Sequence, residues 1–152
     1  AVFLAQRGLD VTAVDLSATG LEKASKLASE RGVTLTTQVV DLADFDLGTS
    51  RWGAIVSIWC HLPEGLRAKV HGGVKTALVP GGVFVLEAYT PRQLKFDTGG
   101  PKNAELLYEP EAVRTELAGL TVERCVELER DVAEGDWHRG KSAVLQVLAR
   151  RP

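Results

Sequence analysis

The feature that most constrains the fold is the middle of the chain, residues 52–89, which has the pattern of a strand, a helix and a second strand. Residues 54–59 form a nearly unbroken apolar run, as is typical of a strand buried on both faces. Pro63 then suits the first residue of a helix with a repeating apolar face. The Pro-Gly-Gly turn at residues 80–82 separates this helix from a second apolar run at 83–86.

This unit predicts two neighbouring parallel strands, because a crossover connection between strands of one sheet is almost always right-handed and returns in parallel. The helix is expected to bury the face formed by Leu66, Val70, Val74, Ala77 and Leu78. Ligands of such sheets bind beyond the carboxyl ends of the strands. The residues at that edge are Trp59, Cys60 and His61 after the first strand and Glu87, Ala88 and Tyr89 after the second.

Composition limits the classes of function. The chain has 152 residues, enough for one domain with a hydrophobic core and no disulfides. A formal net charge of −2 gives no support for a general nucleic-acid or membrane surface. Cys60 and Cys125 both fall in apparent strands, which is typical of reduced core cysteines in a cytoplasmic protein. We therefore expect a cytoplasmic protein that binds neither nucleic acid nor a membrane.

The segments before the central unit also alternate between strands and helices. Residues 11–14 predict a strand that stops at Asp15, and Ser17 suits the N-cap of the helix that follows. Residues 33–40 alternate between apolar and polar side chains, as in an edge strand. The chain opens on what looks like the end of a helix closed by Gly8, so we expect that a preceding segment is missing.

The segments after the central unit follow a different pattern. Residues 90–109 predict a long loop, of the kind that often acts as a lid or a binding segment. A short helix begins at Pro110. Residues 122–132 then alternate as a half-exposed strand, whereas residues 143–148 are almost entirely apolar. We therefore expect an α/β protein whose chain ends in a β-hairpin, with the last strand inside the sheet.

Six short stretches, in this order, resemble a known family. They are AVFLA at 1–5, VDLS at 14–17, WCHLP at 59–63, PGG at 80–82, EAYTP at 87–91, and the segment 134–140 with its Glu-Gly, His and Gly. Together they resemble the class I S-adenosylmethionine-dependent methyltransferases. Within that class the chain looks most like the small bacterial methyltransferases grouped with the TehB-type tellurite-resistance proteins.

The resemblance implies a Rossmann-like, mostly parallel seven-stranded sheet with helices on both faces and a C-terminal antiparallel β-hairpin. In the family, a first strand and a glycine-rich loop would immediately precede Ala1. The sequence is therefore expected to be a single methyltransferase-like domain, residues 1–152, without that first strand. The strands that end at Asp15 and near Trp59 would then each have an unpaired edge.

The ends of the early strands supply candidate residues for binding S-adenosylmethionine. A carboxylate at a strand end, as at Asp15, can accept hydrogen bonds from both ribose hydroxyls of a nucleotide cofactor. The resemblance implies that Asp41 meets the adenine amino group and that the Leu42 amide meets a ring nitrogen. The predicted cofactor-binding residues are Asp15, Leu16, Asp41, Leu42, Ile58 and Trp59. The alternative is that Asp15 is a helix-start acid and Asp41 a solvated loop acid.

The predicted acceptor-binding residues are His61, Tyr89, Glu134 and His138. His61 is polar, lies at the sheet edge and titrates near neutral pH, which suits a positioning group or a base. The turn of the hairpin would hang over the same edge if its first strand runs parallel to the preceding one. The alternatives are a solvated histidine, a rim aromatic and a plain charged turn. We predict no metal site and assign no catalytic residue, because transfer from a sulfonium depends mainly on positioning and exclusion of water.

The function predicted from the sequence is S-adenosylmethionine-dependent methyl transfer to a small-molecule acceptor, with homo-oligomer formation left open. One alternative is an NAD-dependent Rossmann oxidoreductase, because Asp15 suits the ribose of NAD equally well, although the terminal hairpin argues against it. The other alternative is a non-enzymatic truncated domain that associates through its open sheet edges and binds no cofactor.

Overall fold

The computed structural model describes residues 1–134 and 138–152, with only the backbone described for His138. The chain divides into two compact units, Ala1–Asp46 and Leu47–Pro152. Each unit has its own β-sheet. Throughout the described residues, every helix is too short or too polar to cross a membrane.

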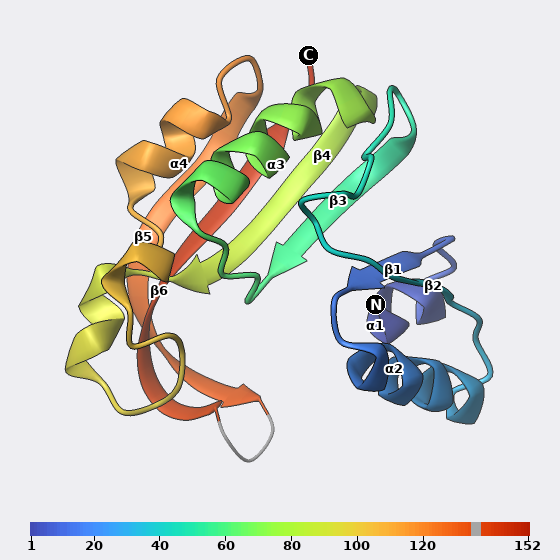
Figure 1. The fold of residues 1–152 in the computed structure, drawn as a ribbon, viewed down its shortest axis with the longest axis horizontal. Coiled ribbons are helices and arrows are strands. Elements are labelled where there is room, and N and C mark those ends of the chain that lie inside the picture. The colour runs from blue at the N-terminus through green and yellow to red at the C-terminus, as the bar shows by residue number, and fades with distance from the viewer. Residues whose placement is uncertain (135–137) are drawn as a thin grey trace. The chain divides into compact units, whose positions relative to one another are not determined.

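The first unit consists of two parallel strands and two helices (Figure 1). Its elements are α1 (Val2–Gln6), β1 (Thr12–Asp15), α2 (Ala18–Glu30) and β2 (Thr36–Val39). In the parallel β1–β2 pair, Asp15 lies opposite Val39. The Ser17 hydroxyl accepts a hydrogen bond from the backbone N–H of Gly20 at 3.0 Å, so Ser17 is the N-cap of α2, as the sequence predicts.

The second unit has a four-stranded sheet in the order β3-β4-β6-β5. Its elements are β3 (Trp52–Ile58), α3 (Glu64–Ala77), β4 (Leu78–Tyr89), η1 (Pro91–Lys95), η2 (Ala104–Leu106), α4 (Pro110–Glu116), β5 (Thr121–Glu134) and β6 (His138–Arg150). β3 pairs with β4 in parallel, and β6 is antiparallel to both of its neighbours. The prediction that the last strand lies inside the sheet is therefore confirmed.

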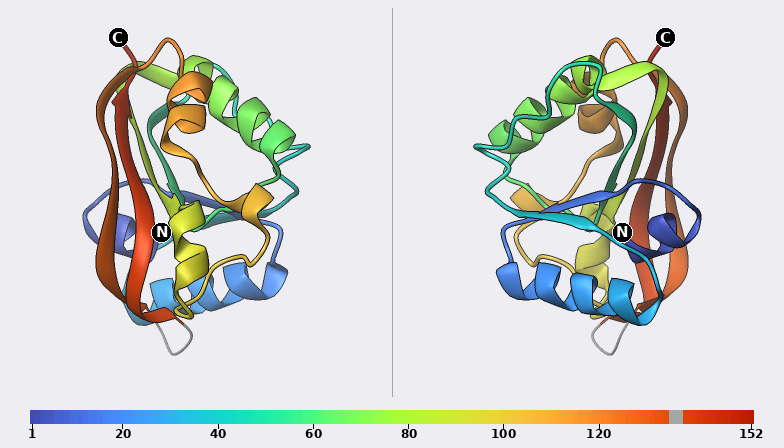
Figure 2. Two further views of the ribbon diagram at one scale, coloured as in Figure 1. Left: turned by 90° about the vertical axis from the view of Figure 1, so that its left-hand side faces the viewer. Right: turned by 90° about the vertical axis from the view of Figure 1, so that its right-hand side faces the viewer.

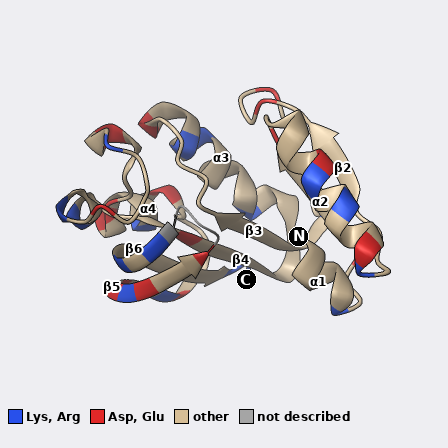
Figure 3. Ribbon diagram, turned by 90° about the horizontal axis from the view of Figure 1, so that it is seen from below, with Lys and Arg blue, Asp and Glu red and all other residues tan. Residues whose placement is uncertain are grey.

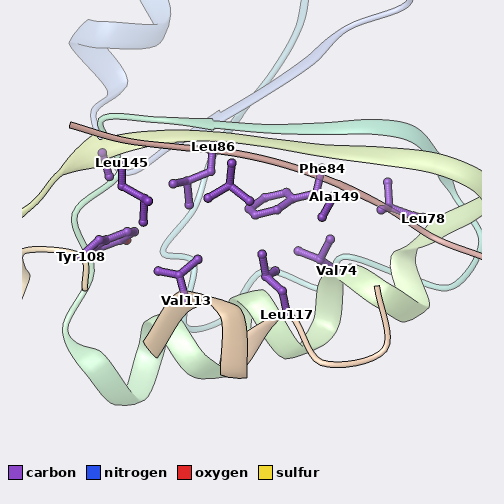
Figure 4. Packing of buried hydrophobic residues seen from close by; sticks show 11 residues of the cluster. Val74, Leu78, Phe84, Leu86, Tyr108, Val113, Leu117, Leu145 and Ala149 are labelled. Atoms are coloured by element: carbon purple, nitrogen blue, oxygen red, sulfur yellow. The ribbon is translucent and has the colours of Figure 1, made fainter. Parts of the chain in front are cut away.

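Both α-helices of the second unit pack on the same face of its sheet (Figures 1 and 2). The hydrophobic core lies between these helices and the strands (Figure 4). Its buried members are Val74, Leu78, Phe84, Leu86, Ala88, Tyr108, Val113, Leu117, Leu145, Val147 and Ala149. Core members lie along β4, and Ile55 of β3 packs against the core, so the core holds the two strands that lead into the candidate site.

The prediction that β3 is buried on both faces is wrong for one face. Val56 and Ile58 are 44% and 46% exposed. Their neighbour Ile55 points to the opposite side and packs against the core. The exposure arises because α3 and α4 both cover the Ile55 side, and an apolar run does not show which side a helix will cover.

The buried face of α3 also differs from the predicted one. The buried stripe contains Arg67 and His71 in addition to Val74 and Ala77, whereas Leu66 and Val70 are only half buried. Two polar side chains can be buried there because a carboxylate on α4 pairs with both of them, as described below. Pro63 is the N-cap and not the first helical residue, a difference of one position.

The predicted turn at residues 80–82 is part of a continuous but irregular β4. Trp52 pairs with Leu78 and Ala54 pairs with Val83, so β4 has extra residues at this point. Gly81 has φ +77 and donates its N–H to the carbonyl of Arg151. Pairing with the end of the chain therefore keeps this segment in the sheet.

β1 pairs only with β2, and β3 pairs only with β4, within the part of the chain that the structure describes. Each of these strands therefore has one edge without a ladder of hydrogen bonds, as expected for this sequence.

Candidate functional site

Asp15 lies at the carboxyl end of β1 and is exposed. Its Oδ1 atom accepts a hydrogen bond from the backbone N–H of Ser17 at 2.8 Å. This local turn fixes the orientation of the carboxylate, since Asp side chains readily bond the backbone two residues later. The carboxylate therefore faces solvent at the strand end, where it can accept hydrogen bonds from a ligand.

Asp41 lies two residues beyond β2 and has the same local arrangement. Its Oδ1 atom accepts a hydrogen bond from the backbone N–H of Ala43 at 2.8 Å. The N–H of Val40 donates to the carbonyl of Asp15 at 3.2 Å, so the two strand ends lie side by side. Because β1 and β2 are parallel, Asp15 and Asp41 lie at the same edge of their sheet.

The surroundings of these two acids fit an adenosine group. Leu16 and Val39 are large apolar side chains that are 69% and 58% exposed. Exposed carboxylates can accept hydrogen bonds from ribose hydroxyls, and exposed apolar side chains can pack against a flat purine. The structure therefore brings together the predicted cofactor residues of the first unit, Asp15, Leu16, Asp41 and Leu42.

In the second unit, Trp59 follows directly after β3 and has a left-handed backbone, with φ +57. This conformation is rare for a bulky residue and costs about 1–3 kcal/mol, so it persists only where its surroundings enforce it. The Trp59 N–H donates to the Glu87 carbonyl at 2.9 Å, and its ring stacks on Tyr89 with centroids 4.5 Å apart. Trp59 therefore forms a wall at the end of β3, beside the predicted cofactor residue Ile58.

His61 is held by the backbone through both ring nitrogens. Nδ1 lies 2.8 Å from the carbonyl oxygen of Leu106, and Nε2 lies 3.4 Å from the backbone nitrogen of Tyr89. A carbonyl can only accept, so Nδ1 carries the proton and Nε2 accepts from the Tyr89 N–H. Burial lowers the pKa of His61, and the hydrogen bond to Leu106 opposes this shift less strongly. His61 is thus a neutral link between three segments of chain.

Tyr89 is 1% exposed and lies at the end of β4. Its ring lies against Trp59 and also stacks with His61, with centroids 5.5 Å apart. Gly100 approaches the same ring so closely that a Cβ atom there would lie 2.5 Å from it. Burial raises the pKa of the Tyr89 hydroxyl, with the negative charge of Glu134 as the next cause.

Glu134 ends β5, and its carboxylate already has partners. Its Oε2 atom accepts from the Trp59 indole N–H, and its Oε1 atom accepts from Arg130 at 3.0 Å. Arg130 also pairs with Glu87, which in turn accepts a hydrogen bond from Gln146. Charged positions recur along β5 and β6 (Figure 3). This ion-pair network connects Glu134 to Trp59 and so to Tyr89 and His61.

The four predicted acceptor residues therefore have different outcomes. His61, Tyr89 and Glu134 lie in one connected cluster around Trp59. The backbone of His138 pairs with Glu134 across the hairpin, but the His138 side chain lies outside the described residues. All four acceptor assignments, including that of His138, stay predictions.

Sequence reasoning missed Tyr108, which lies between η2 and α4. Its hydroxyl donates to the carbonyl of Cys60 and accepts from the N–H of Leu62 at 3.3 Å. Burial raises the pKa of Tyr108 to about 12, so the hydroxyl stays protonated near neutral pH. The sequence offered no signal for it, since Tyr108 lies in the segment expected to be a loop.

A cleft of about 190 Å³ lies in the second unit between the start of α3, η2 and the start of α4. Glu64, Glu105 and Glu109 line it, with Arg67 on its wall. The volume is below that of a pocket for a drug-sized ligand. None of the predicted site residues whose side chains the structure describes lines this cleft.

Parallel βα units with acids at their strand ends, followed by an antiparallel strand inserted between β4 and β5, define the class I methyltransferase architecture. The chain belongs to the methyltransferase domain family, whose characteristic sequence matches residues 1–82. The predicted family, the α/β fold class and S-adenosylmethionine as the cofactor of that family are confirmed.

A curated relative is the 2-heptyl-1-hydroxyquinolin-4(1H)-one methyltransferase of Mycobacteroides abscessus, which is 28% identical over 104 residues. The match covers 66% of this chain and 46% of the relative. The chain thus spans about half the length of the curated relative that it matches.

Two solved structures show the fold likeness. TehB from Haemophilus influenzae has a TM-score of 0.77 at 17% identity, covering 100% of this chain and 53% of that one. The N-methyltransferase NodS from Bradyrhizobium japonicum, in complex with S-adenosyl-L-homocysteine, has a TM-score of 0.66 at 17% identity, covering 94% and 67%. At these identities the likeness concerns the fold alone.

Proposed function

We propose that this chain takes part in S-adenosylmethionine-dependent methyl transfer to a small-molecule acceptor. Membership of the methyltransferase domain family supports the reaction class. The observation that carries the proposal is the pair of exposed carboxylates, Asp15 and Asp41, at the same edge of the β1–β2 sheet. They lie at the carboxyl ends of parallel strands, the edge at which ligands of such sheets bind, and this supports the proposal.

In the first unit, we assign Asp15 to the ribose hydroxyls, and we assign Asp41 with the backbone of Leu42 to the adenine. Leu16 would pack against the same group. In the second unit, Ile58 and Trp59 are the proposed cofactor contacts, and the left-handed backbone of Trp59 is consistent with a functional constraint there.

The chemistry requires little of the protein beyond positioning. S-adenosylmethionine supplies an activated methyl group on a positively charged sulfur, so an acceptor needs in-line placement and exclusion of water. Trp59, Tyr89 and His61 offer a rigid, largely buried aromatic wall for that purpose. Both nitrogens of His61 are already hydrogen-bonded, so we propose that it positions the wall and does not act as a base.

Calorimetric titration with S-adenosyl-L-homocysteine tests the proposal. Asp15→Asn keeps an oxygen for the Ser17 N–H but removes the charge. We expect it to weaken binding by about tenfold or more, because hydrogen bonds to a charged group are lost. Asp10→Asn, at an exposed position before β1, is the matched control and should bind normally. Binding of NAD in place of S-adenosyl-L-homocysteine would favour an oxidoreductase, and binding of neither would overturn the proposal.

A flat heteroaromatic acceptor with an acidic hydroxyl is the acceptor class that we propose. The curated relative is named for a 1-hydroxyquinolin-4(1H)-one, and the half-buried ring of Trp59, which stacks on the buried Tyr89, suits a flat partner. An N-hydroxyl group ionises more readily than an alcohol, which fits a site whose histidine already has partners.

Mass spectrometry with methyl-deuterated S-adenosylmethionine separates the alternatives for the acceptor. We expect a labelled product from 1-hydroxyquinolin-4(1H)-one and none from quinolin-4(1H)-one, which lacks the N-hydroxyl group. Equal labelling of both compounds, or of neither, would contradict this acceptor class without contradicting cofactor binding.

We propose a bacterial TehB-type enzyme with residues 1–152 acting as one methyltransferase-like domain, and a cytoplasmic location. The fold likeness to TehB supports the first of these. Sedimentation would decide whether the chain forms homo-oligomers.

A further inference from the structure

The loop after β3 is held at four consecutive residues by groups from other segments of the second unit. The Trp59 N–H donates to Glu87 on β4. The Cys60 carbonyl accepts from Tyr108, His61 bridges to Leu106, and the Leu62 N–H donates to Tyr108 again. The groups that make these contacts belong to β4, to η2 and to the residues just after η2.

Tyr108 makes two of these contacts with a single hydroxyl. It donates to a carbonyl on one side of His61 and accepts from an N–H on the other side. Its ring is completely buried in the core and lies under the guanidinium of Arg67 at 4.8 Å. Because the ring is fixed in the core, the position of its hydroxyl is also fixed, and the hydroxyl holds the loop in place.

We propose that Tyr108 is a positioning residue whose hydroxyl sets the conformation of residues 59–62 and thereby the placement of the Trp59 wall. The left-handed backbone of Trp59 needs such an enforcing group, because the conformation is unfavourable for tryptophan by itself. The raised pKa of Tyr108 keeps its proton on the hydroxyl, and so keeps the bond to Cys60, throughout the neutral range.

The consequence for function rests on the proposed role of Trp59 and Ile58 in binding the cofactor. If those residues contact it, loosening the loop weakens binding without changing any group that touches the cofactor. Tyr108 thus acts through the loop and is distinct from the acids of the first unit.

Tyr108→Phe tests the inference, because it keeps the ring, its packing and the contact with Arg67. The matched control is Thr90→Val, which removes another fully buried hydroxyl, one that has no hydrogen-bond partner in the described chain. Amide hydrogen exchange of Leu62 is followed by NMR, and S-adenosyl-L-homocysteine affinity by calorimetry, at a temperature where all variants are folded. We expect Tyr108→Phe to speed Leu62 exchange and to weaken binding, each by about tenfold, and Thr90→Val to change neither.

Each other result is decisive. Rapid Leu62 exchange in the unsubstituted chain, or unchanged exchange in Tyr108→Phe, would contradict the proposal that the Tyr108 hydroxyl fixes residues 59–62. Faster exchange with unchanged affinity would show that Tyr108 has a purely structural role and would overturn the positioning inference. Absence of binding by the unsubstituted chain would overturn the proposed function and this inference with it, and that result is recognised before any variant is made. The exchange rate of the Leu62 amide in the unsubstituted chain still tests the proposal if Tyr108→Phe does not fold.

Discussion

The two units of this chain achieve order in different ways. In the first unit, Val2, Leu21 and Ala28 are the buried side chains, and neither strand has a buried residue. In the second unit, eleven buried residues form one core beneath α3 and α4. A two-stranded sheet encloses less apolar surface than a four-stranded sheet that is covered by two helices. We therefore expect most of the measurable stability to come from the second unit.

Two exposed apolar side chains of the first unit lie beside its proposed cofactor residues. Leu16 and Val39 contribute little to stability because they stay exposed to water, yet they flank the acids that we assign to the cofactor. In the second unit the aromatic wall is rigid because rings and backbone groups enclose it. The comparison teaches that local turns orient the proposed residues of the first unit, which are open to solvent, whereas a core fixes those of the second unit.

The largest expected effect contrasts core truncations in the two units. Phe84→Ala should cost about 4 kcal/mol of unfolding free energy, because Phe84 is 1% exposed at the centre of the core. Leu21→Ala, at 6% exposure in the thinner first unit, should cost about 2 kcal/mol. Urea unfolding followed by circular dichroism gives the totals. All three tryptophans fall within residues 47–152 of the sequence, so their fluorescence follows the unfolding of the second unit.

Equal losses of unfolding free energy for the two truncations would contradict this contrast between the units, because they would mean that the first unit is as well packed as the second. Matching fluorescence and circular dichroism curves would show that the units unfold together.

The next effect concerns the buried charges of the second unit. Glu116 on α4 accepts hydrogen bonds from Arg67 and from His71, which lies 2.7 Å away, and these side chains are 9%, 5% and 2% exposed. Glu116→Gln leaves Arg67 buried without its counter-charge, so we expect a loss of about 3 kcal/mol in urea unfolding. The control is Glu111→Gln on the same helix, where a 90% exposed side chain pairs weakly with Arg114 and should change stability by less than about 0.5 kcal/mol. A neutral Glu116→Gln would contradict the structural importance of this pair.

A smaller effect is expected in the first unit from loss of the α2 cap. Ser17→Ala removes the acceptor for the Gly20 N–H and should cost about 1 kcal/mol. Faster amide exchange at Gly20 would locate the effect at the start of the helix. Thr19→Ala, exposed within the first turn, serves as the control. If exchange at Gly20 is the same in Ser17→Ala and in the unsubstituted chain, the cap does not form.

The smallest effect is a dependence on pH that should be confined to the second unit, since all three histidines lie there. Burial lowers the pKa of His71 despite its bond to Glu116, and burial lowers the pKa of His61. The unfolded chain, with a histidine pKa near 6.5, therefore binds more protons than the folded chain below that pH. The stability from the neutral histidines is present above pH about 6.5 and is lost as the pH falls from there towards the lowered folded-state values.

Thermal unfolding followed by tryptophan fluorescence between pH 7.5 and 5.5 measures this effect. The midpoint should fall on acidification, and replacement of His71 by Gln should reduce that fall. A midpoint that rises on acidification would contradict this expectation. It would mean that Glu116 affects the pKa of His71 more strongly than burial does, and that this pKa is raised.

Much of the architecture could be predicted from local patterns. The order of strands and helices, the cap at Ser17 and the inner position of the last strand follow from periodicity, turn residues and apolar content. The acids at the ends of β1 and β2 were recognisable for the same reason, because parallel strands present their carboxyl ends at one edge.

Only the tertiary structure decided how these elements use their side chains. Exposure of Val56 and Ile58 depends on which face α3 and α4 cover, and burial of Arg67 and His71 depends on Glu116, far away in sequence. The hydroxyl of Tyr108 reaches residues 46 and 48 positions away. Local sequence patterns report on a residue's own helix or strand. Partners that compensate a buried charge or fix a strained loop come from distant segments, and only folding brings them together.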